Sequence, residues 1–246
     1  MKPVYEQILK QLDFKNRIKI ISISNYLGYY ILTHKYLWEN IEIYNPKGYK
    51  YILNLIKEIN NCPKKVLCVA CSKIKINLNQ FDLCKLNHLD ISNSKINLND
   101  LVKILYRTKL EKLYLKRINF YNIMRHIINT QSDTLQELDL SISKKCNYKV
   151  NNLKNINKLN NLKILKINNN NISFEIFTQI LKLPNLEKLE MIDCLINEKS
   201  NLCFCSRIKK IREPLIKLKE FKINGDFFCR NTINILKLYL NSILIV

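Results

Sequence analysis

A motif of regularly spaced apolar residues recurs along most of the chain and constrains its fold more than any other feature. The clearest copies run from Leu162 to Ile172 and from Leu186 to Ile196, and weaker copies begin at Lys64, Leu86, Leu110, Leu135 and Leu218. The second position of the motif falls at Leu67, Leu89, Leu113, Leu138, Leu165, Leu189 and Phe221. Successive copies are therefore 22, 24, 25, 27, 24 and 32 residues apart. A repeat of this length indicates stacked structural units, each of which buries its apolar face against its neighbours.

Each copy of this repeat motif predicts a short strand followed by a turn. Two apolar residues separated by one position indicate a strand in which buried and outward side chains alternate. The Asn or Cys that follows, at Asn170 and Cys194, is expected to turn inward and to hydrogen-bond backbone groups left unpaired where the strand ends. The motif fades after Ser141, and an insertion at residues 203–214 lengthens the last interval.

The segments between the strands carry apolar residues at spacings of three and four, which predicts helices over residues 100–105, 122–128 and 174–181. Strand, inward Asn or Cys, and helical return together resemble leucine-rich-repeat proteins, in particular their cysteine-containing and ribonuclease-inhibitor-like subclasses. The resemblance implies an α/β solenoid with a curved parallel sheet on its concave side and helices on its convex side. About seven to eight irregular repeats would fill residues 41–246.

The outward strand positions then define a candidate binding surface. Its acidic members (Asp90, Glu137, Asp139, Glu190, Glu220) and its basic members (Lys112, Lys116, Lys166, Lys188, Lys222) are equal in number. A balanced surface favours a protein partner over a nucleic-acid backbone, which needs an excess of cations. The predicted partner-binding residues are His88, Asp90, Lys112, Tyr114, Lys116, Glu137, Asp139, Ile164, Lys166, Lys188, Glu190 and Ile192.

The chain as a whole carries a net charge of +21. A charge of this size is typical of proteins that bind nucleic acid or anionic surfaces. An alternative origin is codon bias, because Lys, Asn and Ile are abundant and their codons are rich in A and T. Since the charges at the outward strand positions cancel, we expect the excess positive charge on the convex helices, loops and termini.

The first forty residues differ from the rest. Ile8, Leu9 and Leu12 share one helical face, and Asp13 or Asn16 is a plausible N-cap for a second helix around Ile18. The alternation of Ile18 and Ile20 also permits a strand. The segment Leu37-Trp38-Glu39-Asn40-Ile41-Glu42-Ile43 leads into the repeats.

This segment resembles an F-box through Ile8-Leu9-Lys10-Gln11-Leu12, Ser24 with Tyr26, and the closing Leu37-Trp38. The resemblance implies an F-box-like domain over residues 1–40 that binds a Skp-family adaptor. The adaptor would link the chain to a cullin-RING ubiquitin ligase. The residues implied to face the adaptor are Ile8, Leu9, Leu12, Ile18 and Trp38. The alternative is a plain helical cap on the end repeat, which solenoids need.

Features that would suggest an enzyme, a metal protein or a membrane protein are weak. No signal peptide or apolar run of membrane-spanning length is found, so we expect nine reduced cysteines in a cytoplasmic or nuclear protein. The Cys68-x-x-Cys71 and Cys203-x-Cys205 pairs lack a second pair at ligand spacing, and His34, His88 and His126 are scattered. The glycines are too few for a phosphate-binding loop, and nothing aligns a Cys–His nucleophile pair. We therefore expect no catalytic, metal or cofactor site.

The function predicted from the sequence is a protein-interaction module, namely the substrate-recognition subunit of an SCF-type cullin-RING ubiquitin ligase. A protein substrate would bind the concave face, and the chain would act as a monomer within the complex. A repeat scaffold with no ligase role is the alternative. A non-specific binder of nucleic acid or anionic surfaces is a third possibility. Neither a membrane nor a specific nucleic acid is an expected partner.

Overall fold

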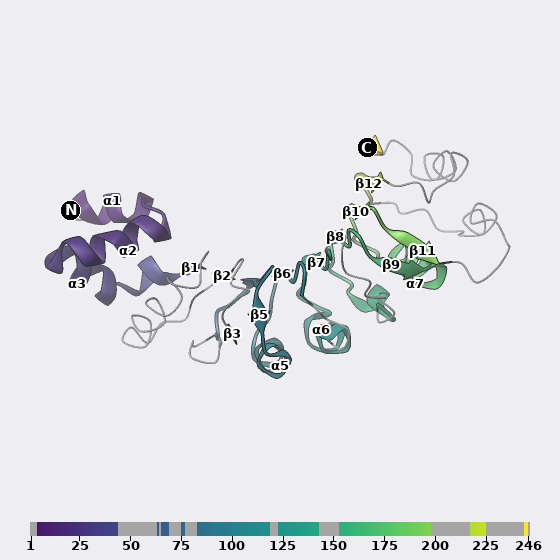
Figure 1. Cartoon of the computed structure of the whole chain (residues 1–246), viewed down its shortest axis with the longest axis horizontal. Helices are drawn as coiled ribbons and strands as arrows, with labels where there is room; N and C mark the ends of the chain where they lie inside the picture. Colours follow the sequence, from purple (N-terminus) through teal and green to yellow (C-terminus); the bar gives the residue numbers. More distant parts are fainter. Residues whose placement is uncertain are drawn as a thin grey trace. The chain divides into compact units, whose positions relative to one another are not determined.

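The chain folds into α-helices and parallel β-strands, which group into two compact units (Figure 1). The computed structural model describes residues 4–43, 63, 65–68, 75–76, 83–118, 123–142, 153–197, 217–224 and 244–245. The first unit is Met1–Leu110 and the second is Glu111–Val246. The predictions for the segments after Ser141 and at residues 203–214 lie outside the described residues.

The first unit opens with a block of three helices, which we call the helical block. Its elements are α1 (Val4–Gln11), α2 (Phe14–Ile23), α3 (Asn25–Thr33) and the 3-10 helix η1 (Lys35–Trp38). Asp13 is the N-cap of α2, and its carboxylate accepts a 2.7 Å hydrogen bond from the Asn16 amide. One of the two predicted caps is thus confirmed, whereas the strand alternative for Ile18 and Ile20 is wrong.

A third helix, which the sequence did not predict, results from Ser24. Its backbone N–H ends α2 by donating to the Ile20 carbonyl, and its hydroxyl caps α3 by accepting from the Leu27 amide. Four residues further on, Gly28 lets α2 and α3 approach closely. A Cβ added at Gly28 would lie 3.1 Å from the backbone oxygen of Ile21.

The core of the helical block is built around Trp38, which is 1 % exposed. Its ring packs edge-on against Phe14 with centroids 5.8 Å apart, and its indole N–H donates to the Ile31 carbonyl at 2.8 Å. Leu9 from α1 and Leu37 from η1 are also buried. All three helices therefore share one apolar core.

The rest of the first unit holds parallel strands. β1 (Asn40–Ile43), β2 (Lys65–Cys68) and β4 (His88–Asp90) pair in that order, and β3 (Lys75–Ile76) pairs with β5 (Lys95–Ile96). Helix α5 (Leu98–Arg107) follows β5 and covers the predicted helix at residues 100–105.

The second unit repeats strand and return. Its six-stranded parallel sheet has the order β6-β7-β8-β10-β12-β13. The strands are β6 (Lys112–Tyr114), β7 (Glu137–Asp139), β8 (Ile164–Lys166), β10 (Lys188–Ile192), β12 (Glu220–Asn224) and β13 (Leu244–Ile245). The returns contain α6 (Ile123–Gln131), η2 (Ile156–Lys158), α7 (Phe174–Ile180) and the pair β9 (Asn171–Ser173) and β11 (Leu195–Asn197).

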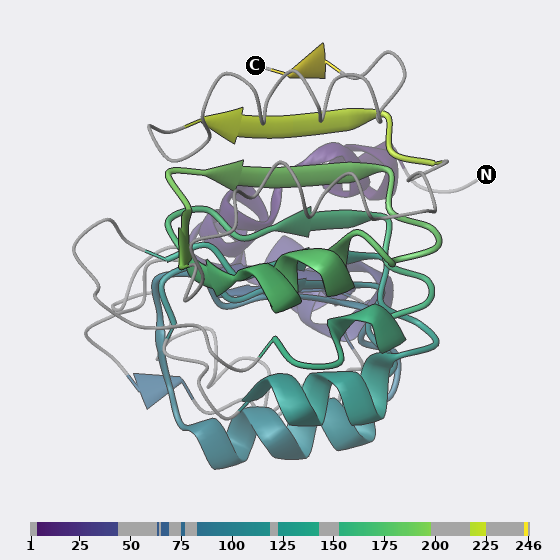
Figure 2. The same cartoon turned by 90° about the vertical axis from the view of Figure 1, so that its right-hand side faces the viewer.

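Helices α6 and α7 cover the two predicted return helices of this unit and lie on one side of its sheet (Figures 1 and 2). On the other side, the described residues of this unit place no helix (Figures 1 and 2). We call that side of β6, β7, β8, β10 and β12 the sheet face.

The register of the sheet follows the repeat motif. Leu138 lies opposite Leu165, which lies opposite Leu189, which in turn lies opposite Phe221. Each of these four side chains is fully buried. Equivalent positions of successive copies thus stack into one apolar column, because a parallel pairing in register keeps every inward residue beside its counterpart.

The inward Asn and Cys behave as predicted. The Asn170 amide nitrogen donates to the carbonyls of Leu140, Ile167 and Asn168 at 3.1, 2.8 and 3.2 Å. The Cys194 thiol donates to the Ile167 carbonyl at 3.0 Å. In four copies of the motif, the residue just before the inward position has a positive φ, which bends the chain out of the strand. These residues are Asn93, Arg117, Asn169 and Asp193.

Candidate functional site

Exposed apolar side chains concentrate on the helical block. Of the six large hydrophobic residues that are strongly exposed among the described residues, only Tyr106 lies elsewhere. The other five come from all three helices of the block: Val4, Ile8, Ile23, Tyr26 and Tyr29. A concentration of exposed apolar residues on one small block marks a candidate surface for a protein partner.

The predicted adaptor-facing residues divide into two groups. Ile8 is 53 % exposed, and Leu12 and Ile18 are half-buried. Leu9 and Trp38 are buried inside the block itself, with exposed fractions of 2 % and 1 %. Leu9 and Trp38 therefore hold the helices together, and a partner that binds the folded block meets Ile8 instead.

Arg17 organises the helical block in a way that the sequence did not reveal. Its guanidinium donates to the carbonyls of Leu9, Lys10 and Leu37 at 3.0, 3.4 and 2.6 Å. The first two carbonyls end α1 and the third belongs to η1, so that one side chain ties α2 to both. Burial lowers the pKa of Arg17, although the nearby Asp13 and Glu42 oppose this effect. Arg17 is the first arginine of a lysine-rich chain, and the next is Arg107.

A second cluster joins α1 to α3. Tyr5 packs edge-on against Tyr26 and Tyr30, with ring centroids 6.1 and 5.0 Å apart. The Tyr30 and Tyr36 hydroxyls lie 3.2 Å apart. Burial, followed by this contact, raises the pKa of Tyr36. These contacts fix the helices that carry the exposed apolar residues.

The sheet face of the second unit brings together most of the predicted partner-binding residues. Those on its strands are half-buried and alternate with buried residues: Lys112, Tyr114, Glu137, Asp139, Ile164, Lys166, Lys188, Glu190 and Ile192. Glu220 and Lys222 continue the face on β12. Lys116 lies in the turn after β6 and is exposed. His88 and Asp90 lie on β4 of the first unit.

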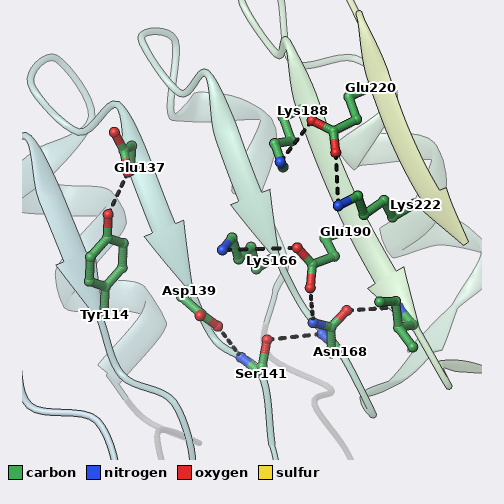
Figure 3. Close-up of polar contacts among 11 residues, drawn as sticks. Tyr114, Glu137, Asp139, Ser141, Lys166, Asn168, Lys188, Glu190, Glu220 and Lys222 are labelled. Carbon is green, nitrogen blue, oxygen red and sulfur yellow. Dashed lines mark hydrogen bonds and ion pairs between the residues drawn. The ribbon is translucent and has the colours of Figure 1, made fainter. Parts of the chain in front are cut away.

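The charges of the sheet face are paired with one another. Glu137 accepts from Lys112 through one carboxylate oxygen at 2.5 Å. Its other oxygen accepts from the Tyr114 hydroxyl, also at 2.5 Å (Figure 3). Both donors come from the neighbouring strand, where Lys112 lies directly opposite Glu137. The carboxylate therefore joins β6 to β7 across the face.

Two further glutamates repeat this arrangement (Figure 3). Glu190 accepts from the side-chain amide of Asn168 at 2.5 Å and lies 3.9 Å from the Lys166 ammonium. Glu220 receives Lys188 at 2.7 Å on one oxygen and Lys222 at 3.1 Å on the other. Hydrogen bonds from Lys188 and Lys222 lower the pKa of Glu220.

Asn168 and Ser141 complete the network, and the sequence did not single out either residue. The Asn168 side-chain oxygen accepts from the backbone N–H of Ile192 at 2.7 Å. The Ser141 hydroxyl accepts from the backbone N–H of Asn168 at 3.2 Å. Asp139 accepts from the Ser141 amide at 2.9 Å, and Asp90 makes the same bond to Ser92 in the first unit. The two aspartates thus have a local structural role, because each closes a turn at the end of its strand.

Two of the cysteines have described side chains: Cys84 is exposed and Cys194 is buried. The Cys68-x-x-Cys71 and Cys203-x-Cys205 motifs involve side chains outside the described residues. Among the side chains that are described, no group of three or more His, Cys, Asp and Glu residues is placed to hold a metal ion.

Burial of the Cys194 thiol implies that the stability of the fold falls at high pH. Burial raises the pKa of this thiol from 9.0 to about 12. The thiol ionises at lower pH in the unfolded chain than in the folded one. The stabilisation that the neutral Cys194 thiol gives the folded state is therefore fully present below about pH 9 and is lost as the pH rises towards 12. We expect the free energy of unfolding of the wild type to fall more between about pH 8 and pH 10.5 than that of Cys194→Ala. Urea titrations followed by circular dichroism would test this, and equal losses in the two proteins would contradict it.

No protein-family model matches the chain, and no curated protein is significantly similar to it. Within the described part of the chain, every helix is too short or too polar to cross a bilayer.

Proposed function

We propose that the chain is a leucine-rich-repeat solenoid preceded by an F-box-like helical block, and that it acts as the substrate-recognition subunit of an SCF-type cullin-RING ubiquitin ligase. The helical block would bind a Skp-family adaptor. The sheet face would be the concave surface that holds a protein substrate. Ubiquitin transfer would take place elsewhere in the complex, so this chain needs no catalytic residues, and the complex would work in the cytoplasm or nucleus.

The observation that carries this proposal is the exposed apolar surface of the helical block. The block has its own core around Trp38 and Phe14, and the exposed Val4, Ile8, Ile23 and Tyr29 lie outside that core. Val4 and Ile8 are four residues apart on α1 and thus lie on one face of the helix. Such side chains remain exposed at a cost in solubility, which a bound adaptor would remove by covering them.

The repeats support the second half of the proposal. The register places equivalent residues of each copy side by side, and the sheet face mixes apolar groups (Tyr114, Ile164, Ile192) with paired charges. Protein interfaces have this mixed composition. Several strands about 4.8 Å apart offer a surface wide enough for a folded partner or a peptide.

The adaptor contact can be tested with exposed residues alone. The wild-type chain is expected to bind a purified Skp-family adaptor in a pull-down and in titration calorimetry, whereas Ile8→Asp weakens binding at least tenfold because it places a carboxylate in an apolar interface. Tyr106→Asp is the matched control, since Tyr106 is 61 % exposed, against 53 % for Ile8, but lies on α5 outside the block. It should bind like the wild type.

Absence of binding by the folded wild-type chain would refute the ligase role and leave the repeat scaffold and the non-specific binder as the remaining interpretations. Equal weakening by Ile8→Asp and Tyr106→Asp would show that the block is not the contact surface.

A further inference from the structure

The three glutamates of the sheet face have both carboxylate oxygens engaged by neighbours on the same face. Glu137 meets Lys112 and Tyr114, Glu190 meets Asn168 and Lys166, and Glu220 meets Lys188 and Lys222. The fourth carboxylate, Asp139, accepts the Ser141 amide. Every oxygen of the three glutamates thus has a donor within the face.

The four lysines differ from the glutamates in this respect. Each ammonium has three N–H donors, and the described contacts of Lys112, Lys166, Lys188 and Lys222 use one of them at each residue. Between 28 % and 41 % of each of these side chains is exposed. Four lysines against four carboxylates leave the strand positions of the face without net charge. The strand positions of the face are therefore electrically neutral. The lysines keep N–H donors for a partner, and two of the glutamates, Glu137 and Glu190, are only 20 % and 16 % exposed.

We propose that the sheet face binds a polypeptide segment without net charge that is rich in hydrogen-bond acceptors, and that Glu137, Glu190 and Glu220 determine this specificity by excluding polyanions. The acceptors would be backbone carbonyls and the side-chain oxygens of Asn, Gln, Ser and Thr. This inference rests on the proposed function, because it describes the partner that the sheet face would hold.

Exclusion of polyanions follows from the pairing. Affinity for a nucleic acid or an acidic chain comes mainly from cations that replace its counterions. A lysine whose charge is already balanced by a glutamate 2.5–3.9 Å away contributes little to this exchange. In a chain of net charge +21, the pairing keeps one surface available to a neutral partner. Tyr114, Ile164 and Ile192 add apolar area that such a partner can cover.

The first test uses a fluorescein-labelled single-stranded oligonucleotide as the polyanion. The triple variant Glu137→Gln, Glu190→Gln, Glu220→Gln keeps the shape of the side chains but leaves the four lysines without counter-charges. We expect it to bind the probe at least tenfold more tightly than the wild type at low salt, with a steeper dependence of affinity on salt by about two to three ions. Glu187→Gln is the matched control, because Glu187 pairs with Lys219 at 2.7 Å in the loop before β10. It should change the affinity less than twofold.

The lysines give the reciprocal result. In the wild-type background, Lys166→Met with Lys188→Met is expected to leave oligonucleotide affinity within twofold, whereas the same pair should abolish the gain of the triple variant. A tenfold loss in the wild-type background would overturn the proposal, since the sheet face would then itself bind polyanions. Circular dichroism melts of every variant establish that the second unit is folded.

The second test identifies the preferred occupant directly. Random dodecapeptides displayed on phage are selected on the wild type, and peptides that also bind the Lys166→Met, Lys188→Met variant are removed. Enriched peptides with a net charge near zero, many Asn, Gln, Ser and Thr residues, and affinities that change less than threefold between low and high salt would support the proposal. Enrichment of acidic peptides, or of none that depends on these lysines, would overturn it. The adaptor experiment depends on the helical block alone, so its failure is distinguishable from failure here.

Discussion

Replacing Leu9 with Asp is expected to unfold the helical block, whereas the same replacement at the adjacent Ile8 leaves it folded. Leu9 is 2 % exposed and packs in the core that contains Trp38, while Ile8 is 53 % exposed. Burying an unpaired carboxylate costs several kcal/mol, which is comparable to the whole stability of a small domain. An exposed substitution at Ile8 changes stability by roughly 0.5 kcal/mol.

Trp38 provides the measurement, because it is the only tryptophan of the chain and lies in the core of the block. The emission of Leu9→Asp should resemble that of a solvent-exposed indole without denaturant, and Ile8→Asp should retain the wild-type spectrum and urea midpoint. If Leu9→Asp kept the wild-type midpoint, the core described around Trp38 would be incorrect. The pair also separates folding from adaptor binding, since only Ile8→Asp tests the surface of a folded block.

The strands of the second unit were predictable from the sequence for a physical reason. Buried and outward residues alternate along a strand with a period of two, and this alternation falls at the same positions in each repeat. Leu165 and Leu189 therefore identify both the strands and their register. The inward positions of Asn170 and Cys194 were predictable in the same way, since a buried polar side chain at the end of a strand must satisfy backbone groups.

The helical block was less predictable because adjacent apolar residues are ambiguous there. Ile8, Leu9 and Leu12 all fit the apolar face of one helix. Which of them is buried depends on how α1 is turned towards the rest of the block, and in the structure Leu9 is buried and Ile8 is not. The role of Arg17 was not visible at all, because its acceptors are backbone carbonyls, which carry no sequence signature.

The pairing on the sheet face falls between these cases. Lys112 and Glu137 are directly opposite once the register is known, so their ion pair could have been predicted. The contacts of Tyr114 with Glu137 and of Asn168 with Glu190 are diagonal and depend on side-chain conformation. A balanced count of charges therefore indicated neutrality but did not reveal that the carboxylates are engaged within the face.

Replacing Asn170 with Ala is expected to destabilise the second unit by about 3 kcal/mol, a large effect for the loss of one polar side chain. Asn170 is fully buried, and its amide nitrogen donates to three carbonyls, of which that of Leu140 belongs to the preceding repeat. Removing the amide leaves these carbonyls without that donor, and the contacts with Leu140 and Ile167 are buried. Because two repeats share the side chain, the loss should weaken their association and not only one turn.

Asn185→Ala is the matched control for this prediction, since Asn185 also links neighbouring repeats but does so at the surface. Its amide donates to the Asn160 carbonyl at 2.6 Å and accepts from Lys217, and both contacts are exposed. Water can replace these partners, so we expect a loss below about 1 kcal/mol. Urea unfolding followed by far-ultraviolet circular dichroism measures both variants, with Trp38 fluorescence reporting separately on the helical block. Equal losses for the two variants would mean that burial of Asn170, and with it the inward position of the repeat motif, does not determine how tightly the repeats are joined.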